Sequence, residues 1–255
     1  MTNILKRLDK IGGEEMRLKL AFQLSSKKFP KNYRELILSY LKSALTHYEN
    51  GCYFEKFYGK CIQKSYSFAA RLPKCQFNEN HILLEENCFD LFLSFSNPSD
   101  SVTLYNAVNQ QRYEPYPLPF ENSCTLVNIS MEKEHNITGN EIICQLAMPL
   151  IIKVHKRDTN MDRFVIFSDN DFEEELFKIV SAQVEYSGMD KSLLEGFNCE
   201  PLRCKKAVVS YKNGYLTGTL GIIRLTGCPE LLQMLYEMGI GSKRSSGFGY
   251  INIIR

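Results

Sequence analysis

The same order of predicted elements, strand–helix–strand–strand–helix–strand, occurs twice along this chain and constrains its fold more than any other feature. The clearest element is a helix over residues 31–48, in which apolar side chains recur at intervals of three and four. Pro30 precedes this helix, at a position where helix starts tolerate proline. Each of the remaining elements is predicted less clearly, and the evidence for the fold comes mainly from their order along the chain.

The first copy of the pattern runs from residue 16 to residue 132. Its strands are expected over residues 16–24, 61–70, 89–95 and 123–130. Its second helix is expected to start with Ser99 or Asp100 as N-cap and to end near residue 112. The proline-rich stretch 115–119 is expected to separate elements, and residues 1–15 are expected to be an extension outside the fold.

The second copy spans residues 138–255. Its elements are expected as a strand over 141–154 with a break or bulge at Pro149, a helix over 169–184, strands over 202–211 and 215–225, a helix over 229–238 and a short terminal strand. The two middle strands are expected to pair as a hairpin, because Asn213-Gly214 is a strong turn signal. The chain is therefore predicted to be an α+β protein of two tandem ferredoxin-like (RRM-like) βαββαβ domains with a C-terminal glycine-rich loop.

That loop lies between the last predicted helix and the last predicted strand. Four glycines, Gly239, Gly241, Gly247 and Gly249, surround a basic and serine-rich insert, residues 242–246. Glycine permits positive φ and close approach of the backbone to a ligand, and the cations and hydroxyls of the insert are groups that contact phosphate and sugar. A helix C-terminus carries a partial negative charge, so anion binding here has to come from the amides and cations of the loop itself. The plainer alternative is that Gly239 caps the helix and a mobile tail follows.

These segments resemble one known family. The helix over 229–238, Gly239-Ile240-Gly241 and Gly247-Phe248-Gly249 are similar to the C-terminal signature of the CRISPR repeat-processing endoribonucleases of the RAMP superfamily. The opening strand 16–20, Tyr33 and the stretch 64–68 resemble that family's first strand, first helix and basic residue before an aromatic second strand. The resemblance covers residues 16–255. It implies that RNA is held along the interface of two ferredoxin-like domains and cut without metal, leaving a 2′,3′-cyclic phosphate and a 5′-hydroxyl.

The composition of the chain excludes several classes of protein. A net charge of +2 and a pI near 8.0 exclude a generally basic nucleic-acid coat protein, so an RNA site has to be a local patch. We expect neither a membrane span nor a signal peptide, because no apolar run is long enough and residues 1–15 are polar. Nine scattered cysteines without a CxxC pair favour reduced thiols in a cytoplasm and argue against zinc. No acidic cluster has the pattern of a metal site, and we expect no cofactor.

Cutting RNA through its own 2′-hydroxyl requires a base, an acid and a cation that stabilises the phosphate. The resemblance assigns His47 as catalytic histidine, Tyr33 as catalytic tyrosine and Lys64 as the phosphate-stabilising lysine. Because the stretch before Lys64 is longer than in the family, Lys56 or Lys60 could take its role.

Each of these residues also has a plainer interpretation. His47 could be a surface histidine at a helix C-terminus, Tyr33 fits the apolar stripe of its helix, and Lys64 could simply be solvated. Tyr33 and His47 are fourteen residues apart, which is about 21 Å along a straight helix. They can share a site only if the helix ends well before His47.

RNA contacts are predicted for both the glycine-rich loop and a second basic patch. The predicted residues are Gly239, Gly241, Ser242, Lys243, Arg244, Ser245, Ser246, Gly247 and Gly249 in the loop, and Lys153, Lys156, Arg157 and Lys205 in the patch. His155 lies in the patch and is expected to contact RNA rather than to act as a base. The expected partner is CRISPR repeat RNA, with effector-complex subunits and a second copy of the chain as further candidates. Two alternatives stay open: a non-catalytic RNA-binding subunit of the same superfamily, and a ferredoxin-like protein without an RNA role.

Overall fold

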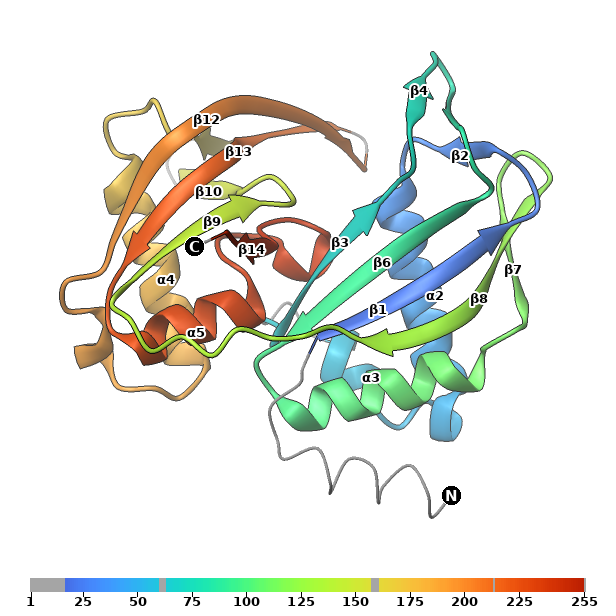
Figure 1. Ribbon diagram of the computed structural model, residues 1–255, viewed down its shortest axis with the longest axis horizontal. Helices are drawn as coiled ribbons and strands as arrows, with labels where there is room; N and C mark the ends of the chain where they lie inside the picture. The colour runs from blue at the N-terminus through green and yellow to red at the C-terminus, as the bar shows by residue number, and fades with distance from the viewer. Residues whose placement is uncertain (1–16, 60–62, 157–160, 213, 255) are drawn as a thin grey trace.

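The computed structural model describes residues 17–59, 63–156, 161–212 and 214–254 (Figure 1). Two units lie side by side, each with an antiparallel sheet and two long helices. The N-terminal unit contains β1 (Arg17–Leu24), α2 (Tyr33–His47), β3 (Tyr66–Arg71), β6 (Cys88–Phe95), α3 (Pro98–Gln110), β7 (Pro115–Leu118) and β8 (Asn122–Met131). Its five-stranded sheet has the order β3-β6-β1-β8-β7. Apart from β7, this is the strand order that a βαββαβ fold produces.

The core of this unit follows from the alternation along β1. Leu18, Leu20, Phe22 and Leu24 are buried on one face of the sheet. They belong to one cluster with the apolar stripe of α2, including Ile37, and with residues of α3. The apolar face of α2, which has a helical period, and the apolar face of β1, which has a two-residue period, therefore pack into a single core.

The C-terminal unit repeats this arrangement. It contains β9 (Glu141–Leu146), β10 (Ile152–Lys156), β11 (Met161–Val165), α4 (Phe172–Tyr186), the short η3 (Lys191–Leu194), β12 (Asn198–Tyr211), β13 (Gly214–Thr226), α5 (Pro229–Met238), the single turn η4 (Arg244–Ser246) and β14 (Ile251–Ile253). The four-stranded sheet has the order β12-β13-β9-β14, which is the same permutation as in the first unit. The expected hairpin of β12 and β13 is confirmed, although Asn213 itself lies outside the described residues.

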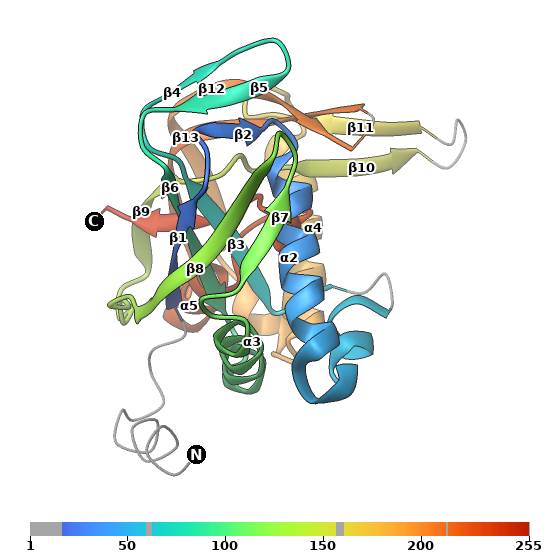
Figure 2. The ribbon, with the colours of Figure 1, turned by 90° about the vertical axis from the view of Figure 1, so that its right-hand side faces the viewer.

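Several expected elements differ in detail. The expected strand over 141–154 is two strands, because β9 pairs with β13 and β14 whereas β10 pairs with β11 in a separate hairpin that extends from the unit (Figure 2). Pro149 lies in the break between them. The proline-rich stretch forms β7 instead of a break, and it occupies a sheet edge, where the missing N–H of proline is tolerated. The N-cap of α3 is Asn97, whose side chain accepts from the Asp100 amide at 3.2 Å.

The segment between α2 and β6 holds further structure that the pattern did not predict. It contains the short turns η1 (Tyr48–Gly51) and η2 (Glu55–Gly59), and a small sheet in which β5 (His81–Leu84) pairs with both β2 (Lys28–Pro30) and β4 (Cys75–Phe77). Strands of three or four residues are too short to show a periodicity. The expected strand over 61–70 begins only at Tyr66, and residues 60–62 lie outside the described part.

A buried arginine joins the two units. Arg17 of β1 donates to the carbonyl oxygen of Tyr236 at 2.7 Å and to that of Ile251 at 2.9 Å. Its guanidinium also lies 3.7 Å from the centroid of the Tyr236 ring. Each unit has its own core, formed by residues between 18 and 126 in one and between 137 and 251 in the other. We therefore propose that residues 16–132 and residues 138–255 form the two domains. The expected extension 1–15 lies outside the described residues.

Within the described parts of the chain, no helix combines the length and apolar character that crossing a membrane requires.

Candidate nucleic-acid interface

The glycine-rich loop is packed between the two units instead of projecting into solvent. All four glycines have positive φ, and a Cβ atom on Gly249 would lie 1.9 Å from the Ile240 carbonyl oxygen. On Gly247 it would lie 2.6 Å from the Phe68 ring of β3. Gly239 caps α5, as the plainer alternative expected. The glycines are therefore required by close packing of protein against protein, which corrects the expectation that they let a ligand approach the backbone.

The loop amides are also used internally. The amide of Ser242 donates to Ile151 O at 2.7 Å, and that of Gly249 donates to Pro149 O at 2.9 Å. Gln183, fully buried in α4, accepts from the Gly241 amide at 3.2 Å and donates to Gly239 O at 2.9 Å. The expectation that the amides bind an anion therefore fails for Gly241, Ser242 and Gly249, whose N–H groups already have protein acceptors.

Arg244 is turned inward and is only 5% exposed. Its Nη1 donates to Met238 O at 2.9 Å, a carbonyl at the end of α5, and its Nη2 donates to Gln63 Oε1 of the other unit at 2.9 Å. Burial lowers the pKa of Arg244 to about 10. The prediction that Arg244 contacts RNA phosphate is therefore replaced by a role in holding the loop against the N-terminal unit.

The side chains of the loop that remain accessible open onto a cleft of about 550 Å³. The cleft is lined by Gln63, Lys64, Lys153, Val154, His155, Glu175, Lys178, Ile179, Ala182, Gly241, Ser242, Lys243, Arg244 and Ser245. The structure thus brings the predicted Lys64 and Lys153 together with Ser242, Lys243 and Ser245 of the loop. These residues come from both units, as an interface that holds RNA requires.

Other predicted contacts lie elsewhere. Ser246 closes η4, where its amide donates to Lys243 O at 2.9 Å. Lys205 is exposed on β12, the edge strand of its sheet, and the lining of the cleft does not include it among the described residues. Arg157 and the side chain of Lys156 lie outside the described part of the chain.

Lys243 is a partly buried cation in the lining of the cleft. Burial makes the largest contribution to lowering the pKa of Lys243, and repulsion from Lys153 and Lys212 lowers it further. Its Nζ also lies 5.3 Å from the centroid of the Tyr211 ring. Mutually repelling ammonium groups at one point make that point attractive to an anion such as phosphate.

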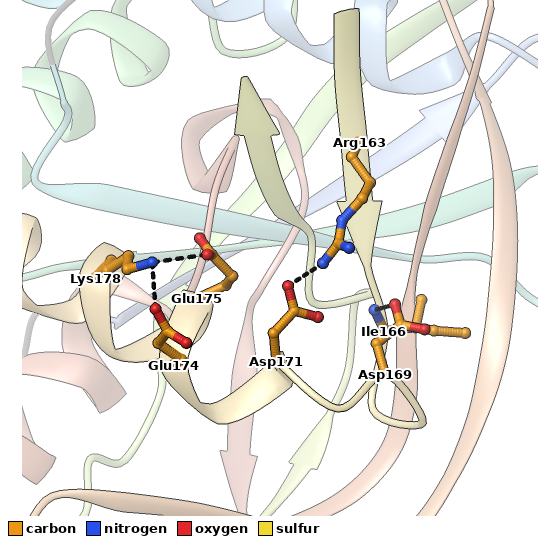
Figure 3. Close-up of polar contacts among 7 residues, drawn as sticks. All are labelled: Arg163, Ile166, Asp169, Asp171, Glu174, Glu175 and Lys178. Atoms are coloured by element: carbon orange, nitrogen blue, oxygen red, sulfur yellow. Dashed lines mark hydrogen bonds and ion pairs between the residues drawn. The ribbon is translucent and has the colours of Figure 1, made fainter. Parts of the chain in front are cut away.

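The β10–β11 hairpin forms one wall of the cleft and carries an ion-paired cluster. Asp162 accepts from Lys153 Nζ at 2.7 Å and from His155 Nδ1 at 2.9 Å. These hydrogen bonds, with that of Lys153 the larger, hold the pKa of the Asp162 carboxyl below its usual range. The hairpin is anchored to the start of α4, where Arg163 pairs with Asp171 and the Ile166 amide donates to Asp169 at 2.9 Å (Figure 3).

The opposite wall is part of α4 and contributes a lysine that sequence analysis did not single out. Lys178 Nζ lies 2.7 Å from Glu174 Oε1 and 2.8 Å from Glu175 Oε1 (Figure 3). Both carboxylates raise the pKa of Lys178. This cation is therefore already partly neutralised inside the cleft.

Of the predicted catalytic residues, His47 lies at the C-terminal end of α2 and is exposed. Its Nδ1 is 2.8 Å from the carbonyl oxygen of Ser43 and 3.2 Å from Gln111 Nε2. Nδ1 thus faces both a carbonyl oxygen, which only accepts, and an amide nitrogen, which only donates, so these two contacts do not assign the tautomer of His47.

Tyr33 begins the same helix. It is buried, its ring stacks on Phe29 with centroids 6.0 Å apart, and burial raises its pKa. Because α2 runs without a break over 15 residues from Tyr33 to His47, the two residues lie about 21 Å apart. Tyr33 is therefore a core residue at the opposite end of α2 from His47, and these two residues do not share one site. Among the described residues, those that line the cleft include neither Tyr33 nor His47.

Sequence analysis also missed the residues that hold the loop: Gln63, Gln183 and Arg34, whose Nε donates to Gly247 O at 3.1 Å. Gln183 had a detectable signal, because it is a polar residue on the buried stripe of α4 together with Val180 and Val184. The other two had none. Within the described ranges, no group of three or more histidine, cysteine or acidic residues is arranged to hold a metal ion.

Comparison with known proteins finds similarity to one family over residues 131–253. The model of the family "CRISPR associated protein Cas6, C-terminal" matches residues 131–253. A protein of Pyrococcus horikoshii described as CRISPR-associated endoribonuclease-like protein Cas6nc is 25% identical over 118 residues, 46% of this chain and 49% of that protein. The match thus spans about half the length of that relative.

Similar solved structures cover nearly the whole chain. One, described as "An RAMP protein binding different RNA substrates", has a TM-score of 0.81 at 21% identity, covering 94% of this chain and 100% of the other. A second, described as "Characterization of a Cas6-related gene from Pyrococcus furiosus", has a TM-score of 0.81 at 19% identity, with coverages of 94% and 99%. Residues 131–253 of this chain are therefore similar to the Cas6 C-terminal domain, and the chain as a whole shares its fold, two tandem ferredoxin-like units, with these solved structures.

Proposed function

We propose that this protein processes CRISPR RNA by binding repeat RNA in the cleft and cutting it within the repeat. The observation that carries the proposal is the convergence of Lys64, Lys153 and Lys243 from both units on one cleft beside the glycine-rich loop. Lysine ammonium groups bind the RNA backbone, and hydroxyls such as that of Ser242 contact phosphate and sugar. The Cas6 family of the C-terminal half and the endoribonuclease-like description of the relative from Pyrococcus horikoshii support the same activity.

The proposed reaction needs no metal. A base removes the proton of a 2′-hydroxyl, the oxygen attacks the adjacent phosphorus, and the 5′-oxygen leaves, so that the products end in a 2′,3′-cyclic phosphate and a 5′-hydroxyl. Family resemblance assigns the base to His47, whose imidazole is exposed at the end of α2 and therefore accessible to RNA. Lys64 would stabilise the charge on the phosphate. We assign no proton transfer to Tyr33, because its hydroxyl belongs to a buried ring.

The test is incubation of the protein with labelled repeat RNA in excess EDTA. We expect a single cut, with the ends named above, that His47→Ala slows by about 10²–10⁴-fold. Thr46→Ala is the matched control, since Thr46 is an exposed neighbour at the same end of α2. A cut that appears only when a divalent metal ion is added would contradict the proposed mechanism.

A second candidate function is favoured by one observation, the separation of Tyr33 from His47 at opposite ends of α2. The chain would then be a guide-RNA-holding subunit that binds in the same cleft without cutting and delivers the RNA to other CRISPR effector subunits. Tight binding of repeat RNA with no cleavage in either EDTA or divalent metal would establish this candidate and remove the first.

A further inference from the structure

The imidazole of His47 is held by groups from two helices. Its Nδ1 lies 2.8 Å from the carbonyl oxygen of Ser43, one turn earlier in α2, and 3.2 Å from Gln111 Nε2. Gln111 is the C-cap residue of α3, and its Nε2 also lies 3.3 Å from Ser43 Oγ. Within the described part of the chain, Nε2 of His47 has no hydrogen-bond partner, and the side chain is exposed. One ring nitrogen is thus bound by the protein, and the other is open to a ligand.

The two contacts make conflicting demands on Nδ1. The Ser43 carbonyl oxygen only accepts, so an unprotonated Nδ1 would place two lone pairs against each other at 2.8 Å. The Gln111 amide nitrogen only donates, so a protonated Nδ1 would face a second donor at 3.2 Å. The amide oxygen, Gln111 Oε1, is meanwhile buried and has no hydrogen-bond partner among the described residues. Because buried polar atoms are normally paired, this oxygen is the missing acceptor for the ring.

A half-turn of the Gln111 amide about its last side-chain bond removes the conflict. The turn exchanges Oε1 and Nε2, so that the oxygen faces His47 Nδ1 and Ser43 Oγ. Nδ1–H then donates to Ser43 O and to Gln111 Oε1, and the Ser43 hydroxyl donates to the same amide oxygen, which has two lone pairs. The amide nitrogen takes the buried position. The number of unpaired amide atoms therefore stays the same, while the clash of two donors or two acceptors at Nδ1 disappears.

We propose that Gln111 is the positioning residue for His47 in RNA cleavage. Its amide oxygen accepts from Nδ1–H and so leaves the basic lone pair on Nε2, the exposed nitrogen, because the hydrogen bond of one ring nitrogen sets the form of the other. The inference rests on the proposed function, in which His47 removes the proton of the 2′-hydroxyl, and names the residue that prepares this base. Gln111 itself makes and breaks no covalent bond. A neutral amide also orients the ring without placing a negative charge near the phosphate.

The tautomer of His47 can be measured without RNA. At a pH where the imidazole is neutral, ¹⁵N NMR of the wild-type protein should show the Nδ1–H form. Gln111→Met, which keeps the length of the side chain and removes the amide, should raise the share of the Nε2–H form. A wild-type His47 that is mainly in the Nε2–H form would overturn the inference, whatever the protein does to RNA.

The second test measures single-turnover cleavage of repeat RNA in EDTA and RNA affinity in parallel. Gln111→Met should slow cleavage by about 10–100-fold with the dissociation constant little changed. Gln111→Glu, whose carboxylate also accepts from Nδ1–H, should recover part of the rate. The acid limb of its pH–rate profile should lie at higher pH than in the wild type, because the carboxylate stabilises the imidazolium. A residue with only a structural role would not move the pH profile.

Gln110→Met is the matched control. Gln110 is the same residue type, ends α3 next to Gln111 and is exposed. This variant should cut at the wild-type rate with the wild-type pH profile. Thermal denaturation checks that each variant is folded before its rate is compared.

Three outcomes of the cleavage assay would overturn the inference. Gln111→Met that cuts at the wild-type rate would show that Gln111 does not position His47, without affecting the proposed function. Equal losses of cleavage and of RNA affinity in this variant would make Gln111 an RNA contact. A wild-type protein that binds repeat RNA but never cuts it would remove the proposed endoribonuclease activity and, with it, the role of Gln111 in cleavage.

Discussion

Gly249→Ala tests whether the glycine-rich loop is shaped by internal packing or by a ligand. Gly249 has a φ of +62°, and an added Cβ would lie 1.9 Å from Ile240 O, a backbone atom that cannot rotate away. The left-handed conformation costs an L-residue about 1–2 kcal/mol, and relieving the overlap costs about 1–3 kcal/mol more. The lower entropy of the unfolded alanine chain offsets about 0.4–1 kcal/mol. We therefore expect the free energy of unfolding to fall by about 1–5 kcal/mol.

Two other glycines separate the contributions in guanidinium denaturation. Gly188 has a φ of +68° with nothing within 4 Å of its added Cβ, so Gly188→Ala carries the conformational cost and the unfolded-chain offset without the overlap, about 0–2 kcal/mol in all. Gly139 has an ordinary φ, and the nearest atom to its Cβ would be 3.9 Å away, so Gly139→Ala should be nearly neutral. If Gly249→Ala is no less stable than Gly188→Ala but loses RNA affinity, the packing argument is wrong and the glycine serves the ligand.

Three further predictions concern single charges. Arg244→Met should lower the free energy of unfolding by about 2–4 kcal/mol, because the buried Met238 O and the partly buried Gln63 Oε1 lose their donor. A variant that keeps its stability but loses RNA affinity would show that Arg244 contacts RNA. Lys243→Ala should weaken RNA binding and reduce the slope of log affinity against log salt by about 0.7–0.9; an unchanged slope would exclude a phosphate contact. The Asp162 carboxyl should titrate below its ordinary 3.8 in an NMR measurement, and Lys153→Ala should move the midpoint upward. Because the folded pKa is depressed, this pairing stabilises the hairpin above the ordinary pKa and is lost as pH falls through the folded value; an unshifted midpoint would contradict the pairing.

Elements with a strong local period were predictable, and those without one were not. The helix at 31–48 and the β12–β13 hairpin follow from side-chain spacing and a turn signal, both of which are local properties of the chain. The sequence of residues 141–154 predicts a single strand. In the structure its first part pairs within the four-stranded sheet and its second part pairs in a separate hairpin, and the first of these pairings depends on a strand distant in the sequence. β7 was missed because proline argues against a strand unless the strand lies at an edge, and edge position is a property of the assembled sheet.

The sequence predicted which kinds of residue form the candidate site, but not which of their side chains face the cleft. The basic and serine-rich insert pointed to RNA, and Lys243 lies in the cleft as expected. Arg244 next to it looks equivalent in the sequence, yet its side chain is buried. His155 was expected to contact RNA, and nothing in the run of basic residues around it indicates that Asp162 faces it across a hairpin.

By itself the sequence determined the order of the elements, the two-fold repeat of the fold and the resemblance of the glycine-rich ending to one family. Each of these depends on residues that are close along the chain. The tertiary structure alone decided which cations face the cleft, what fills the space beside the glycines and which histidine meets a carboxylate. Burial and hydrogen-bond partners are set by contacts such as Arg244 with Gln63, 181 positions apart, and Arg34 with Gly247, 213 positions apart. No local pattern encodes such pairs, because they form only once both units have folded and packed together.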